Sequence, residues 1–470
     1  MSTNSWLGRF LGGVLQHDAI ERRKVLLLAS CFFLTMGGYT VVRELKDLVF
    51  VSVVGLDYVP RAKLLCIIVL VPLVFLYSYL VDALRRNQLL SLCATLYACI
   101  GLTCAYFIGH PSIGLPNTHA SATRIFGWFF YFFLESYQPF LISVFWSFVS
   151  SVTKPDDAKG GYVFVVTAGT VGGALMALLA WFFLEAQGGC YAVFSCAASY
   201  QALMFVASSM LLAMPLLISY LMRITPRSHL HGYEAAYRFE KERERRGETR
   251  GLINRLRGVF DGLFELIKYP YMLGMFGMIF FWEVINVIFS YLRLGAVKGA
   301  SSSVLDFGVY LYQQIFVFQL IGLFIVVIGT RTLVMWLGER RSLVAIPVLI
   351  GIVVSYYLVS RTMFAASAAF LIMRAINYMF ASPLRESLYI PTTKAVKFKT
   401  KTWIDSFGAK LSKATGSCYN LIIQGVPAAA IFSMHIAFFA VVLVLWGIMA
   451  NFLGRRFEEA VEKNELIGAD

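Results

Sequence analysis

Long runs of apolar residues, each about twenty residues in length, dominate this sequence. A helix of about twenty apolar residues spans the hydrocarbon core of a bilayer. A hydrophobic share of 59% and a mean hydropathy of +0.70 exclude a soluble domain folded around one core. The sequence therefore predicts an all-α polytopic membrane protein with about 12 transmembrane helices. The expected spans are 25–44, 62–81, 89–108, 126–150, 162–184, 202–222, 271–293, 308–330, 342–360, 363–381, 411–432 and 435–453.

The connections between these runs alternate between basic and nearly uncharged segments. Basic loops face the cytoplasm, so this alternation predicts that both termini are cytoplasmic. The bias also accounts for the net charge of +14, and no nucleic-acid partner is expected. No targeting extension precedes the first run, which favours a bacterial inner membrane. The basic connections are 82–87, 154–159, 223–257, 338–341, 394–401 and 454–457.

A long polar insertion divides the chain, and short motifs repeat on its two sides. LVDALRRNQLL (80–90) follows the second run and LGERRSLVAI (337–346) follows the eighth. A repeat at matching places predicts two parallel six-helix bundles and a major-facilitator-like architecture. The expected parts are a cytoplasmic segment 1–24, bundles 25–222 and 261–453, a linker 223–260 and a tail 454–470. The repeated charges are expected to latch helices in one end state, with ordinary topological charge as the alternative: Asp82, Arg85, Arg86, Glu339, Arg340 and Arg341.

The first apolar run ends in a charged stretch, VRELKDLVF at 42–50. Charge inside a bilayer costs several kcal/mol and is usually functional. On a helix, Arg43 and Asp47 share one face, and Glu44 and Lys46 lie close by, so these charges can pair with one another. The stretch is either a helix end emerging among the lipid headgroups or a solute or ion site lining an aqueous cavity.

No catalytic or cofactor motif accompanies these spans. The sequence has no HExxH, no paired Cys-x-x-Cys and no nucleophile elbow. The glycines of AGTVGGALMA (168–177) lack the strand and lysine of a phosphate loop and predict close helix packing instead. The eight cysteines fit neither a disulfide scaffold nor a metal spacing, although Cys190 and Cys196 could pair in an external loop. We therefore expect no enzyme activity, no metal and no cofactor.

Four segments resemble one transporter family over nearly the whole chain. They are VRELKDLVF, the segment 133–162 with Glu135, the pair KYPYMLGM and WEVINV (268–275 and 282–287), and 377–417 with its ordered Pro, Arg-Glu and lysines. These segments resemble the bacterial and plastid nucleotide transporters that exchange ATP for ADP, which are distinct from the mitochondrial carriers. The chain departs from the family pattern at Asn286, Asn377 and Ala381, where the family has lysine, lysine and aspartate.

The resemblance implies a site for a polyphosphate anion and an aromatic base. Arginine and lysine suit phosphate oxygens, aromatic rings can stack a base, and Glu135 and Glu283 could gate by exchanging cationic partners or could carry protons. Tyr378 is a further aromatic candidate. The expected substrate-binding residues are Tyr39, Arg43, Lys46, Glu135, Tyr137, Trp282, Glu283, Asn286, Arg374, Asn377, Arg385, Glu386, Lys410 and Lys413.

Three functions remain open at this point. The first is ATP/ADP exchange by alternating access, the second is proton-coupled import of nucleotides or another anion, and the third is a membrane scaffold that keeps the fold. A requirement for internal counter-substrate separates the first two. The expected partners are the lipid bilayer and nucleotides, namely ATP, ADP, other nucleoside triphosphates or phosphate, with a monomer as the starting assumption.

Overall fold

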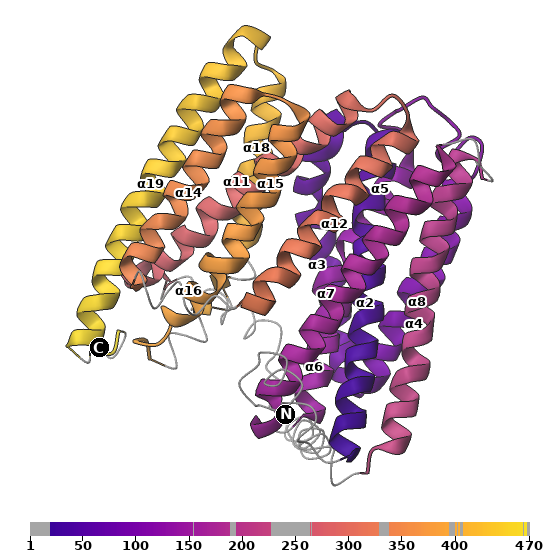
Figure 1. Ribbon diagram of the computed structural model, residues 1–470, viewed down its shortest axis with the longest axis horizontal. Helices are drawn as coiled ribbons and strands as arrows, with labels where there is room; N and C mark the ends of the chain where they lie inside the picture. Colours follow the sequence, from indigo (N-terminus) through magenta and orange to yellow (C-terminus); the bar gives the residue numbers. More distant parts are fainter. Residues whose placement is uncertain are drawn as a thin grey trace. The chain divides into compact units, whose positions relative to one another are not determined.

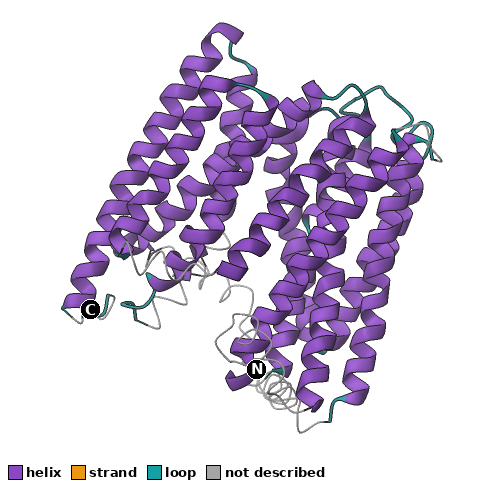
Figure 2. Ribbon diagram, in the orientation of Figure 1, coloured by secondary structure: helices purple, strands orange, loops and turns teal. Residues whose placement is uncertain are grey.

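The chain is built from helices, joined by short turns (Figures 1 and 2). The computed structural model describes residues 19–153, 155–188, 194–226, 264, 266–328, 338–393, 400–401, 403–404, 408–463 and 465–467, without the side chains of 75, 78, 79, 81–83, 155–160, 325–328, 379, 380, 382 and 383. The elements are α2 (Ala19–Val53), η1 (Leu56–Tyr58), α3 (Val59–Ala83), α4 (Arg86–Ile108), α5 (Ile125–Glu135), η2 (Gln138–Ile142), α6 (Ser143–Val152), α7 (Pro155–Gln187), α8 (Cys196–Ile224), α11 (Pro270–Ala300), α12 (Val304–Ile328), α14 (Glu339–Ser360), α15 (Met363–Ile376), η4 (Asn377–Ala381), α16 (Ser382–Ser387), α18 (Ala409–Gln424) and α19 (Ala428–Glu462).

Each expected span coincides with one of these helices or with a run of them, and the polytopic class is confirmed. In the described chain, 8 helices are long and apolar enough to cross a membrane: α2, α4, α7, α8, α11, α12, α14 and α19. Large apolar side chains project outward from them, including Leu216 at 72%, Val359 at 85% and Ile448 at 62% exposure. Apolar side chains are compatible with lipid, and a helix also satisfies its own backbone hydrogen bonds there.

Several expected boundaries are wrong, and the errors have physical causes. The first span does not end at residue 44, because α2 continues to Val53. Leu45 and Leu48 are fully buried on this extension, so the charged stretch lies inside a helix and is not a helix end. The span expected at 411–432 is interrupted, since α18 ends at Gln424 and Pro427 caps α19. The expected tail from 454 is helical as far as Glu462. Residues 1–18, most of the linker and Cys190 lie outside the described residues.

The fourth helix of each expected half contains a π-helical segment, η2 and η4. In the first half, Pro139 lacks an N–H, and its ring crowds the carbonyl of Glu135 four residues earlier, which widens the turn. In the second half, η4 ends at Ala381, and Pro383 lies two residues later in the first turn of α16. Single π-helical turns inside helices are frequent at functional sites. Both segments follow directly on residues that were expected to bind substrate.

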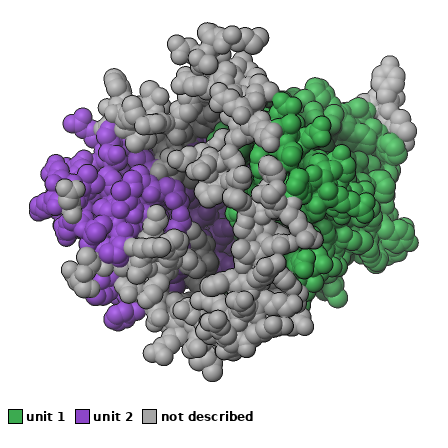
Figure 3. Space-filling view, turned by 90° about the horizontal axis from the view of Figure 1, so that it is seen from below, with its two compact units in different colours: residues 1–248, 301–327 green, residues 249–300, 328–470 purple. Residues whose placement is uncertain are grey.

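The chain forms two compact units, coloured in Figure 3. Unit 1 comprises 1–248 and 301–327, and unit 2 comprises 249–300 and 328–470. In unit 1, α2 packs against α5, α7 and α8, and in unit 2, α11 packs against α15, α18 and α19. Helix α12 lies in unit 1, whereas the expected division puts it in the second bundle. That expected division stays a prediction.

Close packing of α2 against α7 depends on the glycine-rich stretch 168–177. A side chain at Gly172 would place its Cβ 2.5 Å from the carbonyl oxygen of Phe33, well inside contact distance. Glycine at this position therefore lets the two backbones approach. The packing expected from this stretch is confirmed.

Candidate functional site

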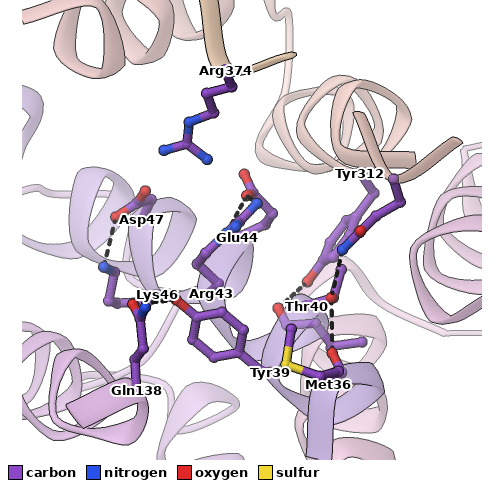
Figure 4. Close-up of polar contacts among 12 residues, drawn as sticks. Met36, Tyr39, Thr40, Arg43, Glu44, Lys46, Asp47, Gln138, Tyr312 and Arg374 are labelled. Carbon is purple, nitrogen blue, oxygen red and sulfur yellow. Dashed lines mark hydrogen bonds and ion pairs between the residues drawn. The ribbon is translucent and has the colours of Figure 1, made fainter. Parts of the chain in front are cut away.

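Lys46 lies at the centre of the charged turn of α2 (Figure 4). Its ammonium group forms an ion pair with the carboxylate of Glu135, at the end of α5, and lies 3.5 Å from Asp47 Oδ1. It also lies 4.6 Å from the centre of the Tyr131 ring, a cation–π contact. The Lys46 side chain is only 10% exposed. A cation so far removed from water needs these partners, because an unpaired buried charge is very costly.

Arg43 and Glu44 form a second pair on the same turn. Arg43 Nη2 and Nε donate to Glu44 Oε1 at 2.9 and 3.1 Å. The charges thus pair with one another, as the sequence predicted, and Lys46 pairs in addition with Glu135. Pairing within one turn lets the helix continue through this charged stretch.

Two tyrosines lie beside these charges and have different environments. The rings of Tyr39 and Tyr137 stack with centres 5.4 Å apart. Tyr137 is 1% exposed, and its hydroxyl donates to the Thr35 carbonyl at 2.9 Å, so it packs the bundle. Tyr39 is only partly buried, and its hydroxyl donates to Gln138 Oε1 at 3.2 Å. Tyr39 is therefore the better candidate for stacking a substrate.

Unit 2 contains a polar cluster between α11 and α15. Arg374 Nε donates to Asn286 Oδ1 at 3.4 Å, and Asn286 Nδ2 donates to Glu283 Oε2 at 3.4 Å. The guanidinium groups of Arg374 and Arg293 lie 4.1 and 4.4 Å from the centre of the Phe370 ring. This cluster combines two guanidinium groups with one carboxylate.

The two units place polar side chains at matching positions, a carboxylate in unit 1 and a guanidinium in unit 2. Glu135 lies three residues before η2 (135 against 138), and Arg374 lies three residues before η4 (374 against 377). Glu135 contacts Lys46 on α2, the first helix of the first half. Arg374 contacts Asn286 on α11, the first helix of the second half. The corresponding helices, α2 with α5 and α11 with α15, therefore carry a polar contact in each unit.

Comparison with known proteins bears on the fold. No protein-family model matches the chain, and no curated protein matches it in sequence. Similar solved structures include the xylose transporter XylE from E. coli, with a TM-score of 0.57 and 14% identity over 93% of this chain and 95% of that one. The nucleoside transporter NupG has a TM-score of 0.55 and 12% identity over 93% of this chain and 99% of that one. A bacterial homologue of the human lysosomal transporter Spinster has a TM-score of 0.58 and 12% identity over 94% of this chain and 98% of that one.

This chain has a major-facilitator-like fold. At 12–14% identity, the likeness extends to the fold alone. The expected architecture is confirmed.

The other substrate-binding residues expected from the sequence lie elsewhere in unit 2. Arg385 and Glu386 are in α16, 11 residues or more beyond Arg374 (374 to 385) on the same helical run, roughly 16 Å by helix rise. Glu386 pairs with Lys401 at 2.7 Å. Trp282 is 4% exposed and packs in the hydrophobic core. The remaining candidates are Asn377, buried in η4, the exposed Tyr378, and Lys410 and Lys413 near the start of α18.

The residues expected to act as gates lie at helix ends. Arg340 Nε and Nη2 donate to Asn451 Oδ1 at 3.2 and 3.0 Å, and Nη1 lies 3.8 Å from Glu458 Oε2, so Arg340 ties α14 to α19 within unit 2. Glu339 and Arg341 flank it in the first turn of α14. Arg85 caps α4, and Arg86 is the first residue of that helix. The side chain of Asp82 lies outside the described residues. Latching remains a prediction.

Tyr131, Gln138 and Phe370 contact the site residues and were not expected from the sequence. Tyr131 precedes Glu135 by four residues, which places both on one helix face. That spacing could have identified Tyr131. Nothing in the sequence indicates that Gln138 contacts Tyr39 or that Phe370 lies beneath two arginines, because these contacts depend on helix packing.

A cavity of about 690 Å³ lies away from these charges, between α4 and α5. It is lined mainly by apolar side chains, including Phe107, Phe126 and Phe129, and Arg124 lies at its edge. Arg124 donates to the carbonyls of the loop that precedes it: Ile113, Gly114, Asn117 and His119. Burial lowers the pKa of the Arg124 guanidinium. The polar lining residues of the cavity are Thr103, Ser112, Thr123 and Arg124.

Proposed function

We propose that this protein is a secondary transporter of nucleotides that exchanges ATP for ADP across the membrane by alternating access. The observation that carries the proposal is the ion pair of Lys46 with Glu135 between two apolar helices, and Arg374 donates a hydrogen bond to Asn286 at the matching place of the second half. Charges at this depth are expensive and are kept where a pathway needs them. A scaffold would be more stable without them.

The arginines of the unit 2 cluster favour an anionic solute. In unit 1, Arg43 and Lys46 face three carboxylates, those of Glu44, Asp47 and Glu135, which leaves one negative charge in excess. An anion that binds Lys46 must displace the Glu135 carboxylate. In unit 2, the guanidinium groups of Arg293 and Arg374 lie in one cluster with Asn286 and Glu283, and guanidinium groups bind phosphate oxygens well.

The nucleotide class rests on the sequence resemblance and on the chemistry of the side chains. Phosphate oxygens can replace Glu135 at the ammonium group of Lys46 and can bind the planar guanidinium of Arg374. The partly buried ring of Tyr39 offers a face for a base. Together these groups meet the needs of a nucleoside polyphosphate.

Proton-coupled import is the second candidate, and one observation favours it. The Glu135 side chain is 33% exposed although it pairs with a nearly buried lysine. A proton could reach this carboxylate and release Lys46 for an anionic solute. The proton would then replace internal ADP as the coupled species.

Uptake of labelled ATP into proteoliposomes tests both candidates. Exchange predicts uptake only with ADP inside, unaffected by collapse of a proton gradient. Uptake that follows the gradient and ignores internal ADP would replace exchange with symport. No uptake under either condition, by protein shown to be folded and inserted, would contradict nucleotide transport.

A further inference from the structure

Gln138, the first residue of the π-helical segment η2, presents an amide group to α2. The Tyr39 hydroxyl of α2 donates to Gln138 Oε1 at 3.2 Å (Figure 4). Gln138 follows Glu135 by three residues (135 to 138), and Glu135 is the partner of Lys46. Because both side chains contact α2, the amide lies on the same side of its helical run as the Lys46–Glu135 pair.

The Gln138 amide has hydrogen-bonding capacity that the protein does not use. A glutamine side chain carries two N–H donors and an oxygen with two lone pairs. The Tyr39 hydroxyl occupies one of these lone pairs. Within the part of the chain that the structure describes, no group accepts a hydrogen bond from Gln138 Nε2, and the residue is exposed. Two donors and one acceptor of the amide are therefore open to a solute.

Tyr39 is itself held in place, and it orients the amide. Its ring stacks on the ring of Tyr137 with centres 5.4 Å apart. Tyr137 is buried, and its hydroxyl donates to the Thr35 carbonyl at 2.9 Å. The Tyr39 hydroxyl donates to Oε1 of Gln138, so this oxygen lies toward Tyr39 and the amide nitrogen points away from it.

This amide lies a short distance from the cation that suits phosphate. The separation along the helices is about 4.5 Å from Glu135 to Gln138 and about 10 Å from Lys46 to Tyr39 (three and seven residues). A nucleotide carries its base and its phosphates on opposite sides of a ribose, which bridges a gap of this size. Phosphates at Lys46 then place the base beside Tyr39 and Gln138.

The donors and the acceptor of the amide match one edge of adenine. Adenine presents the acceptor N7 beside the donor N6–H₂, and glutamine pairs with both at once, through Nε2 and Oε1. Guanine presents two acceptors at the same edge, N7 and O6. With Oε1 of Gln138 held by Tyr39, the guanine O6 would face another oxygen without a proton between them. The arrangement therefore favours adenine over guanine.

We propose that Gln138, oriented by Tyr39, reads the base of the transported nucleotide and selects adenine over guanine. The proposal rests on the proposed function, because it concerns the same site and assigns the residue that determines base specificity. Tyr39 acts on this specificity as a positioning residue, through its hydroxyl.

Nucleotide competition in the full-length protein tests the proposal. Uptake of labelled ATP into ADP-loaded proteoliposomes is measured against rising unlabelled ATP, GTP or 7-deaza-ATP, in which a C–H replaces N7. We expect wild type to bind ATP about fivefold or more better than either competitor, as one lost bidentate pair implies. Gln138→Leu should bind all three nearly equally. Tyr39→Phe keeps the ring without the hydroxyl, so it should retain ATP uptake and lose most of the preference over GTP.

Gln424→Leu is the matched control. Gln424 Nε2 donates to the Tyr291 hydroxyl at 2.8 Å at the end of α18, so this change breaks a glutamine–tyrosine bond in unit 2. We expect it to leave the preference unchanged. A wild type that does not prefer ATP, or the same preference in wild type, Gln138→Leu and Tyr39→Phe, would overturn the proposal and leave nucleotide transport standing. Absence of any nucleotide uptake by inserted wild type would overturn the proposed function as well, so the two failures are distinguishable.

Discussion

At the scale of single residues, the stability of the charged turn depends on the buried ammonium group of Lys46. Its ammonium group is almost excluded from water and depends on two carboxylates, of which Glu135 is the closer. Removing one partner of a buried pair leaves the other charge desolvated and poorly compensated. The partial exposure of Glu135 reduces this penalty but does not remove it.

The change Glu135→Gln should lower the free energy of unfolding by about 1–3 kcal/mol, because Lys46 then keeps only Asp47 as an anionic partner. The double change with Lys46→Gln should cost less than the sum of the single changes, since neither charge is left alone. Thermal unfolding of the four proteins in detergent measures this coupling. Additive effects would show that the two side chains do not interact.

In unit 2, Arg374→Gln should lower ATP uptake at least about tenfold, equivalent to about 1.4 kcal/mol, because the guanidinium beside Asn286 supplies positive charge for phosphate. Arg361→Gln is the matched control, since Arg361 is exposed at the end of α14. Initial uptake rates at equal amounts of inserted protein measure both. Equal rates for the two variants would remove Arg374 from the site.

The residue types of the site could be read from the sequence, but their partners could not. Four charged residues in VRELKDLVF are visible as costly in any membrane helix. The partner of Lys46 lies 89 residues away on another helix, and that contact depends on how α2 and α5 pack. The pairing expected among the four charges is confirmed by the contacts of Arg43 with Glu44 and of Lys46 with Asp47.

At the scale of helices, close approach of α2 and α7 depends on glycine. Gly172→Ala should lower stability by about 1–3 kcal/mol, because the new Cβ meets a backbone carbonyl that cannot move aside. Gly447→Ala is the control, since a Cβ there meets no atom within 4 Å, and it should leave stability unchanged or raise it by up to about 1 kcal/mol. Melting temperatures compare the two. An equal effect of both changes would contradict the packing account.

The existence of the helices was predictable from the sequence, because a helix that spans the bilayer needs a run of about twenty apolar residues. Helix ends were less predictable, as α2 shows by running nine residues beyond the expected end (44 to 53). Its charges pair internally, and nothing forces the helix to stop. The π-helical segments η2 and η4 escaped prediction because a proline in a helix can be met by a kink, a break or a wider turn.

At the scale of the whole molecule, the alternation of basic loops predicts that both termini are cytoplasmic. Cysteine introduced at Asn117, between α4 and α5, should react with a membrane-impermeant maleimide in intact cells. Cysteine at Glu462, at the end of α19, should react only after permeabilisation. Mass-tagged gels measure both reactions in a background without native cysteines. The reverse pattern would invert the topology.

The division of the molecule into two compact units could not be predicted from the repeated sequence motifs. The repeated motifs at 80–90 and 337–346 favour the major-facilitator-like fold, and the structure confirms that fold. They say nothing of α12, whose bonds to Val41 and Thr40 are made by side chains that meet only in three dimensions. The repeat describes the symmetry of the chain, while packing determines its compact units.

The central claim is exchange of nucleotides through a site that contains Lys46, and efflux of preloaded labelled ADP tests it most directly. Proteoliposomes receive external ATP, xylose or buffer, and the variant with Lys46→Ala and Glu135→Ala is the matched control. The account predicts rapid ADP efflux triggered by ATP alone and abolished in the variant. Efflux that ATP does not accelerate, or that the variant retains in full, would contradict it.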